Sequence, residues 1–174
     1  FDEIKDILIE RERMGYLSGF EEKDVEKRVN PGLLLDNCCT IISSGISYYT
    51  DINDLKPENK SSLKYTVSRS SWGQDYHNVL KGMLLKLGEF IKHEYNAEYR
   101  IFVDTGPLPE RAVAKRAGVG FLGKNGFIIN PQFGSFIFLG ELLTTLCIEP
   151  DIPIDDSCGE CDLCIKSCPS CALI

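Results

Sequence analysis

The chain has 174 residues, enough for one good-sized hydrophobic core with a small appended module. With 43% hydrophobic and 26% charged residues it has a globular composition, and no apolar run approaches the roughly eighteen residues of a membrane-spanning helix. The formal net charge of −7 excludes a general nucleic-acid coat, although one local contact patch is compatible with it. Eight cysteines without a secretory signal indicate a reducing compartment, so we expect a cytoplasmic protein.

The first part of the chain predicts two short helices before a strand. The opening segment places apolar residues on one helical face and ends near Gly15. The charged stretch 21–28 is interpreted as a solvated face or loop, and Asn30-Pro31 as the N-cap and first residue of a short helix. Residues 40–49 predict a buried strand, followed by a surface loop over 51–64.

A long helix is expected to begin at Asp75. Its core-facing stripe recurs at intervals of three and four residues: Tyr76, Val79, Leu80, Met83, Leu84, Leu87 and Ile91. His77 and His93 lie at its two ends, where capping or surface roles are the ordinary ones. Residues 100–103 predict a strand that ends at Asp104, and residues 112–117 a short helix.

The glycine-dense segment 118–126 contains the spacing GxGxxG. That motif binds dinucleotides only where it follows a strand and opens a helix, whereas here a helix precedes it and a strand follows. The pattern therefore argues against a dinucleotide site, while its glycines permit a large flat ligand to approach the backbone. Residues 127–129 and 135–139 predict a hairpin, and 149–156 an acidic linker.

Near the end of the chain stands the strongest chemical signal, a run of cysteines followed by proline. Cys158, Cys161, Cys164 and Cys168, with Pro169, have the spacing of a bacterial ferredoxin, in which three thiolates hold one iron–sulfur cluster and the fourth serves another. Structural zinc and a disulfide framework are the alternatives, although zinc usually uses two separated CxxC pairs and disulfides suit short secreted chains. Outside this run, Cys38 and Cys39 are expected to be packing residues.

Asp104 is the best catalytic candidate outside the cysteines, because ligand crevices open where strands end in α/β sheets. A carboxyl group desolvated there has a raised pKa and can hold a proton for a substrate oxygen. The alternative is an aspartate that caps the turn, and Glu110 with Arg111 would equally fit a surface ion pair.

Several spaced motifs, taken in order, resemble epoxyqueuosine reductase over nearly the whole chain. They are Gly15-Tyr-Leu-x-x-Phe20, Ser71-Trp-Gly-x-Asp75-Tyr-His77, Val103-Asp104-Thr-Gly-Pro with Glu110-Arg111-Ala, Ala117-Gly-x-Gly120-Phe-x-Gly-Lys-Asn125, Gly134-Ser-x-x-Phe138-Leu-Gly-Glu141, and the cysteine run 158–169. The resemblance departs from the family where Ser170-Cys171-Ala172 replaces the usual Thr-Gly-Ala turn, so the role of Cys171 stays open.

The resemblance implies an α/β (α+β) fold, with a mixed-sheet cobalamin-binding domain over 1–149 and the start of a ferredoxin-like 4Fe-4S module over 150–174. It also implies that an N-terminal strand, the second cysteine motif and a C-terminal helical region lie outside this sequence, so that cluster and cobalamin binding by this piece alone is an open question. The activity implied is reduction of the epoxide of epoxyqueuosine in tRNA to queuosine, with electrons from a low-potential donor. We further expect a monomer.

By the same resemblance, Asp104 is the proton donor to the epoxide-derived oxygen. The residues that fall where the family contacts cobalamin are Arg28, Ser68, Asp104, Pro109, Glu110, Arg111 and Gly123, and the cluster ligands are Cys158, Cys161, Cys164 and Cys168. The rival hypotheses are a cobalamin-dependent reductase of another substrate, such as an organohalide, a non-catalytic electron-transfer module, and a zinc-stabilised binding module.

Overall fold

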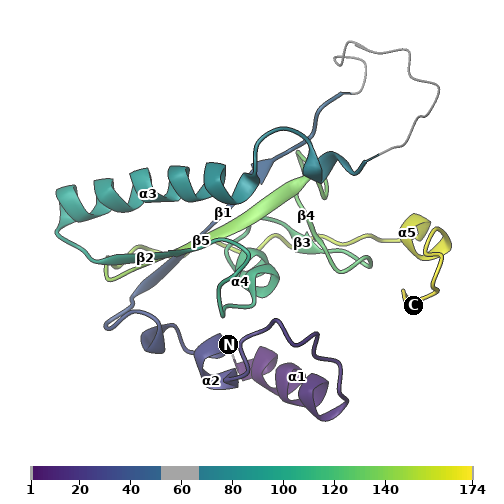
Figure 1. Cartoon of the computed structure of the whole chain (residues 1–174), viewed down its shortest axis with the longest axis horizontal. Coiled ribbons are helices and arrows are strands. Elements are labelled where there is room, and N and C mark those ends of the chain that lie inside the picture. The colour runs from purple at the N-terminus through teal and green to yellow at the C-terminus, as the bar shows by residue number, and fades with distance from the viewer. Residues whose placement is uncertain (1, 52–66, 174) are drawn as a thin grey trace.

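The computed structural model describes residues 2–51 and 67–173. The predicted surface loop over 51–64 lies outside the described residues apart from Asp51. Helices and strands follow one another in the order α1 (Asp2–Arg13), α2 (Val25–Val29), the 3-10 turn η1 (Pro31–Leu33), β1 (Thr40–Ser47), the 3-10 turn η3 (Arg69–Ser71), α3 (Tyr76–Tyr95), β2 (Tyr99–Phe102), α4 (Glu110–Arg116), β3 (Phe121–Leu122), β4 (Ile128–Ile129), β5 (Ile137–Thr144) and α5 (Leu163–Lys166) (Figure 1).

Strand β5 is the centre of the main sheet, between β1 and β2, and both pairings are antiparallel. Ser43 of β1 and Phe102 of β2 both lie opposite Glu141 of β5. Successive side chains of a strand point to opposite faces, so residues 140 and 142 face one side and residues 141 and 143 the other. The register therefore brings Ser43, Glu141 and Phe102 into one row across the sheet.

Helix α3 covers one face of this sheet and α4 the other (Figure 1). Leu142 packs among the helix residues Leu80, Leu84 and Ile91, and Leu143 packs with Val113 of α4 and with Leu34 and Leu108. Each fully buried leucine contributes about 1.5–3 kcal/mol of hydrophobic free energy, so β5 is clamped on both sides. This clamp fixes the position of the segment that begins after β2, where Asp104 lies.

The predicted α/β (α+β) class is confirmed, as are the opening helix, the strand at 40–47, the long helix after Asp75 and the strand before Asp104. The strand pairs of the structure are antiparallel throughout the described residues, where a mixed sheet was expected. The charged stretch 21–28 is partly helical: Asp24 caps α2 by accepting hydrogen bonds from the N–H groups of Glu26 and Lys27. The sequence signal for this helix is Asp24, because an aspartate at the N-cap accepts hydrogen bonds from N–H groups that would otherwise be unpaired.

The predicted hairpin is wrong. Residues 128–129 pair with β3, while β5 leaves to pair with β1 and β2, and only an isolated bridge joins Asn130 to Gly134. Proximity in sequence favours a hairpin, but burial of β5 between α3 and α4 outweighs it. Part of the predicted α3 stripe is also exposed, with Met83 at 54% and Leu87 at 37% exposure.

Cys39 is not a free packing residue, because it forms a disulfide with Cys147. The Cys39 N–H donates to the carbonyl of Thr144 at 2.9 Å, which extends the β1–β5 ladder by one residue and brings the two cysteines together. Cys38, by contrast, is a half-buried free thiol packed against the leucine cluster around Leu143, as predicted, and burial raises its pKa.

Beyond the sheet, the chain runs out to the cysteine-bearing end, which Figure 1 shows extending away from β5 past β3 and β4 to α5. Gly118, at φ +71°, lets the start of this linker pass close to its backbone. A Cβ atom at this position would lie 2.6 Å from the carbonyl oxygen of Ile152, which is too close. Among the described residues, no helix is both long enough and apolar enough to cross a membrane.

Candidate active site beside the sheet edge

Asp104 lies just beyond β2 in a conformation that few non-glycine residues adopt, with φ +60°. Its backbone N–H donates to Glu110 Oε1 at 2.7 Å, and its side chain is 58% exposed. The carboxyl group is thus presented to solvent at the end of the strand, and the expectation of a desolvated carboxyl is not met in this structure. A left-handed aspartate held by a hydrogen bond is a strained position of the kind found at functional sites.

His77 connects Asp104 to a second carboxylate. Its Nδ1 lies 2.7 Å from Asp75 Oδ1, and its Nε2 lies 3.4 Å from Asp104 Oδ2. The hydrogen bond to Asp75, followed by the one to Asp104, raises the pKa of His77 above its ordinary value, and the same bond lowers the pKa of Asp75. A lone histidine at a helix end predicts a capping or surface role, and only the fold shows that His77 meets Asp104, 27 residues later in the chain.

Tyr76 packs beside this site, between His77 and strand β5. Its ring stacks on Phe138 of β5 with centroids 3.8 Å apart and also contacts the His77 ring at 3.9 Å. Burial, together with the negative charges of Asp104, Glu110 and Asp75, raises the pKa of Tyr76 to about 12. The phenol is therefore a stable proton donor and a packing surface at neutral pH rather than a base.

Most of the residues predicted to contact cobalamin lie around the start of α4, and Ser68 makes its hydrogen bond elsewhere. The half-buried Arg28 lies beside the turn before α4, where its Nε donates to the Pro107 carbonyl at 3.3 Å, and Pro109 and Glu110 begin that helix. Arg111 reaches across to the glycine segment, donating to the Gly126 carbonyl at 2.6 Å. Ser68 is apart from them in its hydrogen bonding, its hydroxyl lying 2.8 Å from that of Ser70.

The glycine segment also touches the cysteine run. The Gly123 N–H donates to the Phe127 carbonyl at 2.8 Å, and a Cβ atom at Gly123 would lie 2.8 Å from the side chains of Asn125 and Ile129, which would have to shift. Next to it, the Lys124 N–H lies 3.4 Å from Cys158 Sγ, and Lys124 Nζ donates to the Gly159 and Cys161 carbonyls at 2.8 and 3.1 Å. One loop thus contacts both Arg111 and the first cysteine.

The four predicted cluster ligands Cys158, Cys161, Cys164 and Cys168 are free thiols. In the described part of the chain, no three His, Cys, Asp or Glu side chains are gathered so as to hold a metal ion. Ser170, 3.5 Å from the sulfur of Cys168, lowers the pKa of that thiol to about 7. Soft thiol donors on a short loop, one of them already near a backbone N–H, suit an iron–sulfur cluster in their chemistry.

Two arginines near the Asp104 site suit a cobalamin. Arg28 donates to the Pro107 carbonyl and Arg111 to the Gly126 carbonyl, and guanidinium groups match amide and phosphate oxygens. These two residues would hold the periphery of a cobalamin. His77 is hydrogen-bonded to Asp75 and Asp104, and His93, in the last turn of α3, to Glu94.

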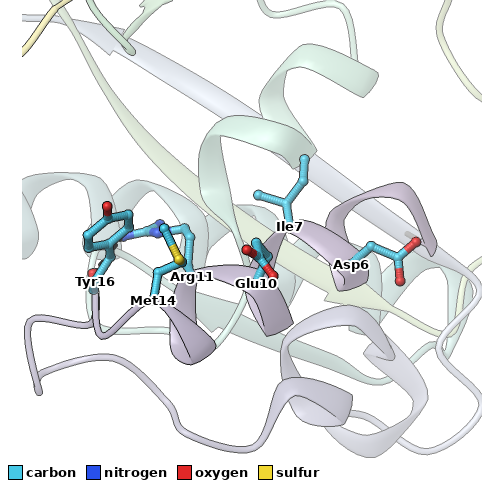
Figure 2. A pocket seen from close by; sticks show the side chains of 6 residues that line it. All are labelled: Asp6, Ile7, Glu10, Arg11, Met14 and Tyr16. Atoms are coloured by element: carbon cyan, nitrogen blue, oxygen red, sulfur yellow. Dashed lines mark hydrogen bonds between the residues drawn. The ribbon is translucent and has the colours of Figure 1, made fainter.

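A separate hollow lies on α1, remote in sequence from these residues. Figure 2 shows its lining side chains, which are Asp6, Ile7, Glu10, Arg11, Met14 and Tyr16. None of the predicted site residues lines it, and Arg11 and Glu10 are hydrogen-bonded to Tyr16 and Arg13, respectively. We assign no chemistry to this hollow.

Comparison with known proteins identifies the relatives of this chain. The sequence model of the family described as "Epoxyqueuosine reductase QueG, DUF1730" matches residues 28–105. Curated epoxyqueuosine reductases of Bacillus subtilis (strain 168) and Lactococcus garvieae (strain Lg2) are 44% and 45% identical over 100% of this chain, which covers 45% and 50% of them. The chain therefore spans about half the length of the curated relatives it matches.

Solved structures agree with the sequence comparison. Epoxyqueuosine reductase from Streptococcus thermophilus superposes with a TM-score of 0.89 at 41% identity, covering 100% of this chain and 47% of that one. A second epoxyqueuosine reductase, solved with a tRNA-Tyr epoxyqueuosine-modified stem loop, has a TM-score of 0.85 at 42% identity, with 99% and 46% covered. A third, from Bacillus subtilis, has its aspartate-bearing catalytic loop swung out of the active site, with a TM-score of 0.88 at 42% identity, covering 99% and 46%.

Proposed function

We propose, from the premise that this chain belongs to the epoxyqueuosine reductase family, that it carries the catalytic part of an enzyme that reduces epoxyqueuosine in tRNA to queuosine. The premise rests on the match over the whole chain in both sequence and fold. The proposal adds cobalamin, 4Fe-4S clusters and Asp104 as the components that carry out the reaction.

The observation that carries this proposal is the continuity from Asp104 to the cysteines. Asp104 is held by Glu110, the neighbouring Arg111 bonds to Gly126, and Lys124 of the same glycine loop contacts Cys158 and Cys161. A proton-carrying group and a cluster-binding run are thus joined through a single loop. An electron-transfer module without catalysis would need the cysteines but has no use for the carboxylates.

The chemistry requires both ends of this arrangement. Removing the oxygen of an epoxide to leave an alkene takes two electrons and two protons and releases water. When bound, cobalamin reduced through the 4Fe-4S clusters supplies the electrons, with Cys158, Cys161 and Cys164 holding the nearer cluster and Cys168 the further one.

The residues of the chain then supply binding and protons. Asp104 is exposed at the end of β2, and a substrate bound over it would desolvate the carboxyl group and favour its protonated form. Asp104 then delivers that proton to the oxygen that leaves carbon, and His77 orients its carboxyl group. Arg28, Ser68, Pro109, Glu110, Arg111 and Gly123 form the cobalamin-facing surface. The exposed left-handed conformation of Asp104 suits a loop that moves toward its substrate, and one solved relative has its aspartate-bearing catalytic loop swung out.

The proposed organisation places the cobalamin-binding domain over residues 1–149 and the start of the ferredoxin-like module over residues 150–174. The tRNA is the substrate partner, in line with the relative solved with a modified tRNA stem loop. A low-potential electron donor and a cytoplasmic, monomeric protein complete the proposal.

The proposal is tested by turnover. The native protein is isolated without oxygen, supplied with iron, sulfide, cobalamin and a reductant, and incubated with tRNA that carries epoxyqueuosine. Nucleoside analysis of the digested tRNA is expected to show queuosine, and a parallel incubation with an organohalide is expected to release no halide. Halide release without queuosine would transfer the proposal to the rival substrate class.

A further inference from the structure

A buried carboxyl group lies beneath the Asp104 site and has no role in the chemistry above. Glu141 is at the middle of β5, with 0% exposure, and neither of its side-chain oxygens has a hydrogen-bond partner among the described residues. An ionised carboxylate in such surroundings costs several kcal/mol, so a buried group of this kind takes up a proton instead.

The register of the sheet shows what surrounds this group. Glu141 lies directly opposite Ser43 of β1, whose buried hydroxyl also lacks a partner in the described structure, and opposite Phe102 of β2. Its neighbour two residues along, Leu143, packs against Val113 of α4, so Glu141 faces the layer that begins with Glu110. Phe102, the β2 partner of Glu141, is two residues before Asp104 in the chain. The buried acid therefore lies on the strand next to the one that leads into the Asp104 turn.

The charged and titratable groups on that side come from every element packed there. Helix α4 contributes Glu110 and Arg111, β2 contributes Arg100, the turn contributes Asp104, and the segment before β1 contributes Cys38. Arg111 is engaged by the Gly126 carbonyl, and Arg100 by the Leu34 carbonyl and the face of Phe102. β1 supplies Ser43, which does not titrate in this range.

Burial, and to a smaller extent the negative charge of Glu110, raises the pKa of Glu141 to about 9. Burial likewise raises the pKa of Glu110, against the hydrogen bond that it accepts from the Asp104 N–H. The negative charge of Glu110 therefore adds to burial in disfavouring ionisation of Glu141, so that Glu141 keeps its proton at neutral pH.

We infer that Glu141 is a positioning residue of this site: as an uncharged carboxylic acid under the sheet, it allows Glu110 to keep its place and hold the backbone of Asp104. The inference rests on the proposed function for its catalytic meaning, while the protonation state of Glu141 stands independently of it. Ionisation of Glu141 at alkaline pH would cause electrostatic repulsion between the Glu141 and Glu110 carboxylates. This repulsion would weaken the hydrogen bond that Glu110 accepts from the Asp104 N–H.

The protonation state is measured first, by carbon NMR of the protein labelled at the glutamate carboxyl carbons. The resonance lost in Glu141→Gln identifies Glu141. We expect the Glu141 resonance to keep the chemical shift of the acid form at pH 7. A Glu141 resonance already at the carboxylate shift at pH 7 overturns the inference.

The positioning role is measured by the pH dependence of turnover. One pH unit above the pKa of Glu141 about nine-tenths of the group is ionised, so this ionisation is expected to lower the wild-type rate about tenfold there relative to neutral pH. Other titrating groups of the site, among them His77, lower the alkaline rate in both proteins, so the fall in Glu141→Gln, which cannot ionise, is expected to be about tenfold smaller than the fall in the wild type. An equal alkaline fall in both proteins refutes the positioning role.

The two failures are distinguishable. If the wild-type protein forms no queuosine at any pH, the proposed function fails, and the NMR titration still decides whether Glu141 is an acid at pH 7. If the wild-type protein turns over but Glu141 proves to be ionised at neutral pH, the inference alone is wrong.

Discussion

The Asp104 turn and the cysteine run 158–168 are assembled in different ways. Around Asp104 the fold brings Asp75 and His77, which are distant in sequence, next to a turn that the nearby Glu110 holds by a hydrogen bond. In the cysteine run the bonds are mostly local turns, and the connection to the rest of the chain is through Lys124. No described group of three metal-binding side chains has formed there.

The difference shows what each region depends on. The acid site is held by the packing of β5 between α3 and α4, so it should exist before any cofactor binds. The cysteine run has few buried contacts of its own, and in such segments the metal supplies the folding energy. We therefore expect the geometry of the acid site to be insensitive to iron and that of the cysteine run to depend on it.

The largest expected effect is at Asp104. Asp104→Asn removes the proton while retaining the shape, and since general acids contribute about 10²–10⁴-fold, queuosine formation is expected to fall by at least about 10²-fold. Cobalamin binding should persist, because the amide leaves the surrounding residues in place. Asp36→Asn, an exposed aspartate outside the site, serves as the control. Undiminished turnover would remove Asp104 from the mechanism.

Loss of a cluster ligand tests the other region. Cys161→Ser is expected to lose most of the bound iron and sulfide in the nearer cluster, because a hard hydroxyl is a poor substitute for a thiolate. Cys171, exposed and at φ +51°, is the matched control, and Cys171→Ser should keep its iron. Metal and sulfide analysis of both variants gives the answer, and zinc in place of iron would contradict the cluster assignment. Loss of iron in the control would make Cys171 a ligand.

The contact between Gly118 and the linker that leads to the cysteine run is tested by alanine substitution at two glycines. Gly15 and Gly118 share φ +71°, but a Cβ atom meets nothing within 4 Å at Gly15 and lies 2.6 Å from the Ile152 carbonyl oxygen at Gly118. Alanine at Gly15 should lower the free energy of unfolding by about 1 kcal/mol, and alanine at Gly118 by about 2 kcal/mol or more. Urea denaturation measures both, and equal losses would mean that the linker does not contact Gly118.

The smallest effect is a shift in the titration of His77. Because its folded-state pKa is raised above 6.5, its contacts stabilise the fold fully below pH 6.5 and are lost as pH rises through the folded-state value. Asp75→Asn should lower that pKa more than Asp104→Asn, since the Asp75 bond is the larger cause. Proton NMR of the imidazole compares the two variants, and a larger effect of Asp104→Asn would reverse the assignment.

What the sequence could predict is what short stretches encode. The start of α3 after Asp75 and the N-cap at Asn30 both depend on neighbours within a few residues, and the structure confirms both predictions. The spacing of the cysteines is also a local pattern, and its interpretation as a cluster-binding run stays a prediction. The strand before Asp104 was likewise visible as a short apolar run.

The pairing of β5 was not predictable in the same way. A hairpin with the preceding residues is the local choice, whereas the actual partners lie about 35 to 100 residues earlier and are selected by burial between two helices. The same long-range step brings His77 to Asp104 and encloses Glu141. The sequence held one signal for Glu141, a single acid within an otherwise apolar strand, which sequence analysis recorded only as part of a family motif.

In the proposed arrangement, the acid turn, the arginines around it and the cysteine run form one site for cobalamin and its electron supply. The electron paramagnetic resonance spectrum of cob(II)alamin, added to the anaerobic native protein after reconstitution with iron and sulfide, tests whether this site exists. We predict a protein-bound cob(II)alamin signal that differs from the spectrum of free cobalamin. The spectrum of free cobalamin beside intact cluster signals would contradict the account and leave an electron-transfer module in its place.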